Sequence, residues 1–203
     1  MGFGWRLSRR SGATAIGEAM AQDTVTRYVR YQHEGKTAIG RLAGETIHEL
    51  SGDLFAGPTD TGRTLPMASV TLLPPTVPSK VIAVGLNYRS HAGESGARQP
   101  GLFAKLPSSL VGHGAAIVIP RDATRVHYEG ELVVVIGRRA RNVSEADAPA
   151  YIFGVTAGND VSERSWQGSD LQWLRAKASD TFGPVGPAIA VGLDYNDLKV
   201  ETR

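Results

Sequence analysis

Cysteine is absent from this sequence of 203 residues. Its absence excludes a disulfide framework and a thiolate nucleophile, and it makes a reducing cytoplasm the expected location. Long apolar runs are also missing. No stretch approaches the roughly 18 residues of a membrane helix, so we expect a soluble chain. Residues 1–22 carry arginines but lack the apolar core of about 7–15 residues that a secretory signal needs. We expect a disordered leader there, with Met20 as an alternative start.

An excess of charge of one sign is missing as well. The chain has 22 Lys and Arg against 20 Asp and Glu, which gives a formal net charge of +2. A surface that binds nucleic acid needs a concentrated basic patch, whereas these residues are spread along the whole sequence. The one cluster, "GRRARN" at residues 137–142, follows an apolar run and is interpreted as a solvated turn. We therefore expect neither a nucleic-acid nor a membrane partner.

Glycine and proline are plentiful and dispersed, with 24 and 11 residues, which favours many short strands joined by tight turns. The segments "TRYVRYQH", "TAIGRL" and "TIHELS" are rich in β-branched and aromatic residues, and they predict an antiparallel meander that ends near Ser51. The proline-rich "LPMASVTLLPPTVPSK" then predicts a linker, because proline interrupts regular structure. We expect the leader at 1–22, a small N-terminal β domain with its linker at 23–77, and a larger domain at 78–203.

The second half also predicts mainly strands. They are expected at residues 81–84 and in the segments "GLFAKLP", "AAIVIP", "HYEGELVVVIG", "YIFGVTAGND" and "GPAIAVG". One helix is expected around "SEADAPAYI", with Ser144 as its N-cap. Strands and helices do not alternate regularly, which disfavours a doubly wound nucleotide-binding fold. The expected fold class is mainly β with a few short helices.

Two carboxylates open the apolar segment "HYEGELVVVIG", residues 127–137. Side chains alternate across a strand, so Glu129 and Glu131 share one face. The continuous apolar run that follows predicts a strand covered on both faces, where neighbouring carboxylates would repel each other. A divalent cation such as Mg²⁺ or Mn²⁺, held by the two glutamates and Asp160, would remove that repulsion. The alternative, glutamates facing solvent and Asp160 capping a turn, stays open.

Four further residues are candidates for chemistry. His91 and Glu94 are three apart in "HAGE" and would meet on one side of a helical turn, where the carboxylate would raise the basicity of the imidazole. Lys177 could hold a substrate carboxylate or a developing enolate. His127 shares the face of the two glutamates and is a conceivable fourth metal ligand. Each has a plainer interpretation: chance spacing for the pair, a solvated lysine and a structural histidine.

Five motifs, in this order and at these intervals, resemble the fumarylacetoacetate hydrolase family: "VGLNYRSHAGESG", "LFAKLPSSLVGHG", "YEGELVVVIGRRARNV", "GNDVSERSWQ" and "RAKASDTFGPVGP". The resemblance covers about residues 78–192. It implies a homodimer with a mixed β-sandwich roll of that family's type, preceded by the small N-terminal domain. Members of the family continue well beyond "DYNDLKVETR", so the resemblance also implies a chain that is truncated at the C-terminus, with an incomplete roll.

The resemblance further implies a set of site residues. Mg²⁺, with Mn²⁺ or Ca²⁺ as alternatives, would be held by Glu129, Glu131 and Asp160. His91 and Glu94 would activate a water molecule, and Lys177 would be the third catalytic residue. The remaining matched positions would contact the substrate, and these are Gln167, Arg89 and Tyr88.

The implied activity is metal-dependent hydrolysis of a carbon–carbon bond in a 2,4-dioxo acid of the acylpyruvate or fumarylpyruvate type, in the catabolism of aromatic compounds. Two alternatives use the same site, namely isomerisation of 2-hydroxyhepta-2,4-diene-1,7-dioate and decarboxylation of oxaloacetate. These reactions share one physical step, the stabilisation of negative charge on an enolate. An alternative of another class is an inactive truncated remnant that only binds a 2-oxo acid or assembles with partners.

Overall fold

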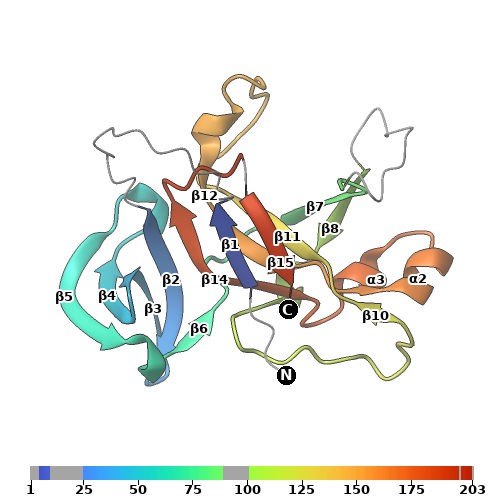
Figure 1. The fold of residues 1–203 in the computed structure, drawn as a ribbon, viewed down its shortest axis with the longest axis horizontal. Coiled ribbons are helices and arrows are strands. Elements are labelled where there is room, and N and C mark those ends of the chain that lie inside the picture. Colours follow the sequence, from blue (N-terminus) through green and yellow to red (C-terminus); the bar gives the residue numbers. More distant parts are fainter. Residues whose placement is uncertain (1–4, 10–24, 89–100, 197, 203) are drawn as a thin grey trace, which may run out of the picture.

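The computed structural model describes residues 5–9, 25–88, 101–196 and 198–202. Strands dominate (Figure 1), which confirms the expected mainly β fold class. The helices are short: α2 (Arg164–Ser169), α3 (Leu174–Ala178) and the 3-10 helices η1 (Leu54–Ala56), η2 (Met67–Ser69), η3 (Pro107–Ser109) and η4 (Ala148–Tyr151). The strands are β1 (Trp5–Arg9), β2 (Thr26–His33), β3 (Lys36–Ala43), β4 (Thr46–Ser51), β5 (Thr59–Pro66), β6 (Thr71–Leu73), β7 (Val81–Gly85), β8 (Gly101–Lys105), β9 (Leu110–Val111), β10 (Val126–His127), β11 (Gly130–Ile136), β12 (Ile152–Asn159), β13 (Ser162–Glu163), β14 (Gly183–Val191) and β15 (Leu198–Thr202).

The predicted meander is confirmed in β2, β3 and β4, which pair antiparallel in sequence order. The two-residue turn between β2 and β3 consists of Glu34 and Gly35, both with positive φ, as tight hairpins with right-handed strand twist require. Inward side chains of the meander and of the neighbouring strands β5 and β6 form a core cluster that consists of Val29, Tyr31, Ile47, Leu65 and Leu72. Burial of these side chains is the main stabilising contribution of this part of the sheet.

One large sheet joins the two halves of the sequence. Its strands follow the order β11-β12-β14-β2-β3-β4-β5, with β6 beside β2 and β9 beside β14. The junction is the antiparallel pair β14–β2, in which Ile189 lies opposite Tyr28. Ile189 is fully buried and packs with Leu54 and Val135 in a second core cluster. The sheet and this cluster therefore fix β11 and β12, which carry the carboxylates, relative to the N-terminal strands.

Regular structure extends into the segment that we expected to be a linker. Strand β6 lies within it and pairs with β2, and Leu72 of β6 is buried in the first core cluster. Strand β5 precedes it and was not predicted, because its "TDTGRT" sequence is polar and all its side chains but Leu65 are exposed. Proline is compatible with a strand at its end, and β5 ends at Pro66.

Two predicted elements of the second half are wrong. The segment "AAIVIP", residues 115–120, forms no strand, and Val118 and Ile119 are 62% and 50% exposed. The helix expected around residues 144–152 is a turn followed by η4. In the turn, the hydroxyl of Ser144 donates to the carboxylate of Asp147 and accepts from its backbone N–H. Pro149 within η4 lacks the N–H group that a longer α-helix would need at that position.

The prediction that β11 is covered on both faces is also wrong. Val135 is buried, but its neighbours Val134 and Ile136 point to the opposite face of the strand and are 42% and 54% exposed, so that face is not covered there. Within the expected leader, residues 5–9 form β1, which pairs with β15, while residues 1–4 and 10–22 lie outside the described residues. None of the helices in the described part of the chain is long and apolar enough to cross a membrane.

Candidate active site

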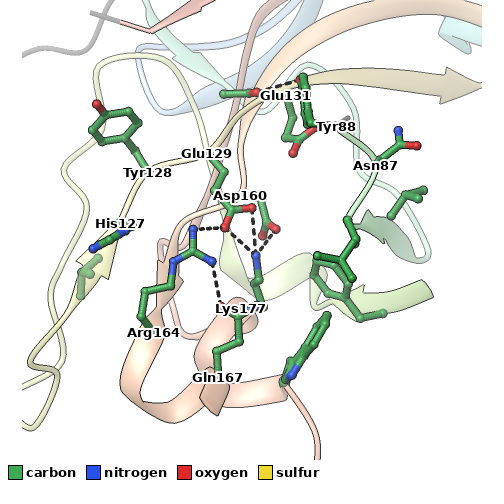
Figure 2. Close-up of a pocket in the computed structure, with 17 residues that line it drawn as sticks. Asn87, Tyr88, His127, Tyr128, Glu129, Glu131, Asp160, Arg164, Gln167 and Lys177 are labelled. Carbon is green, nitrogen blue, oxygen red and sulfur yellow. Dashed lines mark hydrogen bonds and ion pairs between the residues drawn. The ribbon is translucent and has the colours of Figure 1, made fainter. Parts of the chain in front are cut away.

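A pocket of about 640 Å³ lies where β7, β8, β10 and the start of β11 face the two helices α2 and α3. Figure 2 shows Glu129 and Asp160 at the end of Lys177, with Glu131 nearer Tyr88. The pocket lining includes all three carboxylates singled out from the sequence, Glu129, Glu131 and Asp160. These residues come from two strands and the loops beside them, so their meeting depends on how those strands pair.

The antiparallel register of β11 and β12 brings the carboxylates together. Gly130 lies opposite Asn159, which places Glu129 just before β11 next to Asp160 just after β12. The backbone N–H of Asp160 donates to the carbonyl of Glu129 at 2.9 Å. The side chain of Asn159 accepts a hydrogen bond from the N–H of Glu129, also at 2.9 Å. Both loops are thereby held at the base of the pocket.

Lys177 provides the positive charge at the centre of the site. Its Nζ lies 3.1 and 3.0 Å from the two carboxylate oxygens of Glu129, and 2.6 Å from Oδ2 of Asp160 (Figure 2). Only 2% of Lys177 is exposed, so these two carboxylates replace the water that an ammonium group would otherwise bind. The expectation that Lys177 belongs to the same constellation as the carboxylates agrees with this geometry.

A second buried lysine, Lys105 at the end of β8, contacts both Asp160 and the backbone of Lys177. Its Nζ donates to Oδ1 of Asp160 at 2.6 Å and to the backbone carbonyl of Lys177. Burial lowers the pKa of Lys105, although the charge of Asp160 opposes that shift. Lys105 therefore joins the carboxylate of Asp160 to the helix that carries Lys177.

Arg164 and Gln167 border the opposite side of Glu129. Nη2 of Arg164 lies 2.5 Å from Oε1 of Glu129, and Nη1 donates to Oε1 of Gln167 at 2.7 Å. The two residues are three apart on α2 and therefore lie on one face of the helix. The hydroxyl of Ser162 also donates to Glu129, at 3.0 Å. Although burial opposes ionisation, the charges of Lys177 and Arg164 and these hydrogen bonds lower the pKa of Glu129.

Glu131 is the carboxylate that this network does not neutralise. Burial and the charges of Asp160 and Glu129 raise its pKa from 4.5 to about 7, and Lys177 only partly offsets them. Three carboxylate groups thus share a pocket in which two have close cationic partners. The solvent-facing interpretation of the two glutamates is not what the structure shows, since Glu129 and Glu131 both line the pocket and neither is classed among the exposed residues.

The helix α2, which presents Arg164, begins at a buried carboxylate. Glu163 is fully buried and accepts hydrogen bonds from the backbone N–H groups of Trp166, Arg125 and Thr124, at 2.6, 2.6 and 3.1 Å. Burial disfavours its charge, but these donors outweigh burial and lower its pKa from 4.5 to about 2. Glu163 therefore ties the loop before β10 to the start of α2.

The other predicted site residues have three different outcomes. Tyr88 and Gln167 line the pocket, and the hydroxyl of Tyr88 donates to the carbonyl of Gly130 at 3.2 Å. His127 is an exposed residue on the rim and does not join the carboxylates, as Figure 2 shows. The proposed His–Glu pair and one substrate-contacting arginine, His91, Glu94 and Arg89, lie outside the described residues.

As the side chains lie, the described residues contain no group of three His, Asp or Glu side chains placed to hold a metal ion. Nζ of Lys177 lies between Glu129 and Asp160, at hydrogen-bonding distance from both. The predicted metal set therefore remains a prediction, and its chemistry is considered under the proposed function.

Three residues of the site were missed by sequence reasoning. Lys105 lies in the quoted motif "LFAKLP" and Arg164 in "GNDVSERSWQ", but neither was assigned a role. The spacing of Arg164 and Gln167 was an available signal, because residues three apart on a helix meet. Lys105 and Glu163 gave no local signal, since their partners are distant along the chain or are backbone groups.

Two sequence models match the chain. The first, described as Rv2993c-like, N-terminal, matches residues 26–75, and the second, described as fumarylacetoacetate (FAA) hydrolase C-terminal, matches residues 80–203. Among curated relatives, Protein Rv2993c of Mycobacterium tuberculosis is 45% identical over 170 residues, which are 81% of this chain and 64% of that protein. Mitochondrial oxaloacetate tautomerase Fahd2a of Rattus norvegicus is 41% identical over 147 residues, which are 68% of this chain and 47% of the relative.

Solved structures are similar over most of the chain. The 2-hydroxyhepta-2,4-diene-1,7-dioate isomerase from Mycobacterium marinum is 41% identical, with a TM-score of 0.77 over 83% of this chain and 67% of that one. Maleylpyruvate hydrolase from Sphingobium sp. SYK-6, solved with manganese(II) ion and pyruvate, is 27% identical, with a TM-score of 0.65 over 84% and 69%. The chain spans about half to two thirds of the length of the curated relatives it matches. It belongs to the fumarylacetoacetate hydrolase family.

Proposed function

We propose that this chain carries the site of an enzyme that hydrolyses a carbon–carbon bond in a 2,4-dioxo acid. The observation that carries the proposal is the buried ammonium group of Lys177, held between Glu129 and Asp160 at the base of the pocket. Cleavage of such an acid leaves negative charge on an enolate, and a fixed cation in a site with little water stabilises that charge. The maleylpyruvate hydrolase with similar fold, solved with pyruvate, is consistent with this reaction type.

The donor set fits a divalent cation, with Mg²⁺ as the proposed ion. Glu129, Glu131 and Asp160 offer only oxygen atoms, which Mg²⁺ and Mn²⁺ prefer, and Glu131 lacks a close cationic partner. When bound, the ion would supply Lewis-acid polarisation of the 2-oxo acid oxygens.

The remaining residues bind and orient the substrate and move a proton. Arg164 and Gln167 present donors on one face of α2 toward the carboxylate end of the substrate, and Tyr88 borders the same pocket. In hydrolysis, a base must take a proton from the attacking water. We assign that role to His91, with Glu94 holding the imidazolium that results. This assignment comes from the resemblance alone.

Oxaloacetate tautomerisation is a second candidate, which the 41% identical tautomerase of Rattus norvegicus favours. In that reaction a proton leaves the enol oxygen and another is added to C3, and no water attacks. The same buried ammonium group would stabilise the enolate between these two steps. Isomerisation of a dienedioate is the activity in the name of the Mycobacterium marinum structure. That reaction and decarboxylation of oxaloacetate each pass through an enolate of their own, which the same ammonium group would stabilise.

The test follows both reactions on one preparation. The chain is incubated at saturating Mg²⁺ with an acylpyruvate, and loss of the enol absorbance is recorded; enol oxaloacetate is assayed in parallel. Glu131→Gln should abolish both activities and lower Mg²⁺ affinity by calorimetry, while the exposed Glu145→Gln serves as the matched control. Activity on oxaloacetate alone would favour the tautomerase. Substrate binding without either activity would favour the inactive remnant.

A further inference from the structure

One side of the pocket carries no charge. It is formed by Val84 and Leu86 at the end of β7, Phe103 of β8 and Trp173 just before α3, and we call these four residues the apolar wall. Val84 and Leu86 are 40% and 63% exposed, which leaves apolar surface open to water in the pocket. A ligand that covers this surface removes apolar area from water, which favours binding.

The apolar wall begins directly at the cationic centre. Nζ of Lys177 lies 5.1 Å from the centre of the Phe103 ring. The Phe103 and Trp173 rings pack edge to face, with centroids 5.5 Å apart and an angle of 71° between their planes. A substrate whose 2-oxo acid end lies at Lys177 would therefore extend its other end along Phe103 toward Trp173.

Gly85 holds the Trp173 ring at this place. A Cβ atom built on Gly85 would lie 3.2 Å from Cζ3 of the indole, closer than ordinary van der Waals contact. The missing side chain lets the indole lie against the backbone of β7. The position of Trp173 is thus set by packing on two sides, by Gly85 and by Phe103.

The charged side chains of the pocket lie at one end of the apolar wall. Among the lining residues that the structure describes, the permanent cations are Lys177 and Arg164, and both contact Glu129. Against the far part of the wall, near Trp173, a substrate carboxylate would lose water without gaining a cationic partner from these described lining residues, which is unfavourable. A flat apolar group would instead cover the exposed wall and stack on its aromatic rings.

We propose that the apolar wall makes Trp173 and Phe103 specificity-determining residues, which select 2-oxo acids whose distal group is apolar and flat over those with a second carboxylate. The inference rests on the proposed function for the placement of the 2-oxo acid end. It narrows the substrate class from 2,4-dioxo acids in general to those with an aryl or alkenyl group on the 4-oxo carbon.

The test measures binding of probes that cannot undergo the hydrolysis. Calorimetry at saturating Mg²⁺ compares 2-oxobutanoate, 2-oxo-4-phenylbutanoate and 2-oxo-4-(4-carboxyphenyl)butanoate. The phenyl probe should bind roughly tenfold or more tightly than 2-oxobutanoate, because the ring covers apolar surface. The added carboxylate should remove most of that gain.

Variants then assign the effect to the apolar wall. Trp173→Ala and Gly85→Ala should lower the affinity for the phenyl probe and leave the affinity for 2-oxobutanoate unchanged. Trp173→Phe should keep most of the affinity for the phenyl probe. Leu171→Ala, at a residue 95% exposed and outside the pocket, is the matched control.

Three results would overturn the inference. They are a carboxyphenyl probe that binds as tightly as the phenyl probe, no measurable binding of the phenyl probe, and Trp173→Ala weakening all probes equally. The proposed function fails separately, if the expected binding preference is found but no 2,4-dioxo acid is cleaved.

Discussion

At the scale of single residues, the site depends on two buried lysines with different tasks. Lys177 faces the pocket, whereas Lys105 lies behind it and contacts Asp160 and the backbone carbonyl of Lys177. The amino group of Lys105, which is 6% exposed, has lost nearly all its water, and these partners replace it. Lys105 is therefore a positioning residue for Lys177.

Lys105→Met should lower the free energy of unfolding by about 1–3 kcal/mol, because it leaves Oδ1 of Asp160 buried without its hydrogen-bond donor, while Lys177 still contacts Oδ2. Chemical denaturation measures the loss. In the same variant kcat should fall more than KM rises, since the ammonium group of Lys177 is displaced while the substrate contacts of α2 remain. Lys199→Met is the control, because the Lys199 side chain is 59% exposed and its removal should change stability by less than about 0.5 kcal/mol. Equal stability of the two variants would contradict the assigned role.

Glu163 predicts a pH dependence of stability. Its pKa is about 2 in the folded protein against an ordinary 4.5, so its contribution is complete above about pH 4.5 and is lost as the pH falls toward 2. The difference in unfolding free energy between the parent and Glu163→Gln should therefore be large at pH 6 and shrink toward pH 2. Denaturation curves across this range measure it, with Glu145→Gln as the exposed control. A difference in unfolding free energy that does not vary with pH would show that Glu163 stabilises the protein by packing and not by its charge.

At the scale of elements, the contact between the chain after β9 and strand β6 depends on a glycine. A Cβ atom on Gly112 would overlap the carbonyl oxygen of Leu72 and lie 2.8 Å from the carbonyl carbon of Leu73. These are backbone atoms of β6 and cannot rotate away. The contact therefore requires the two segments to approach as closely as their backbones allow.

Gly112→Ala should destabilise the protein by about 1–3 kcal/mol, because backbone must shift to admit one methyl group. Gly168→Ala, in α2, is the matched substitution, since nothing lies within 4 Å of its added Cβ. That variant should gain about 0.4–1 kcal/mol, because alanine reduces the entropy of the unfolded chain. Thermal unfolding of both variants measures the contrast, and a destabilised Gly168→Ala would contradict it.

The sequence predicts correctly those elements whose local residue pattern indicates a strand and which also find a neighbouring strand to pair with. Strands β2 to β4 show β-branched and aromatic residues between turn signals, and they form as predicted. The segment at residues 115–120 is also rich in β-branched residues, but it pairs with none of the described strands, and composition cannot show whether a partner exists. Helix α2 has six residues and begins at the buried Glu163, so its stability comes from tertiary contacts that a local pattern does not contain.

At the scale of the whole molecule, the site is built from segments far apart in the sequence. Lys105 meets Asp160 across 55 positions, and Lys177 meets Glu129 across 48. Strand alternation was enough to place Glu129 and Glu131 on one face, because that rule is local. The partners of the carboxylates depend on how β8 and α3 are placed beside β11 and β12, which no local rule gives. Lys177 was a candidate from its sequence context, and the family resemblance added Gln167. Only the structure supplied Lys105 and Glu163.

The large sheet also bears on self-association, because β11 at its end pairs only with β12 among the described strands. Its Val134 and Ile136 side chains are exposed, and an apolar edge strand favours pairing with another chain. We expect the parent to elute from size-exclusion chromatography with light scattering as a dimer or larger species. Replacing Val134 and Ile136 with lysine should shift it toward the monomer, whereas Leu171→Lys, at a residue 95% exposed away from this edge, should not. A parent chain that stays monodisperse and monomeric as its concentration rises would contradict this expectation.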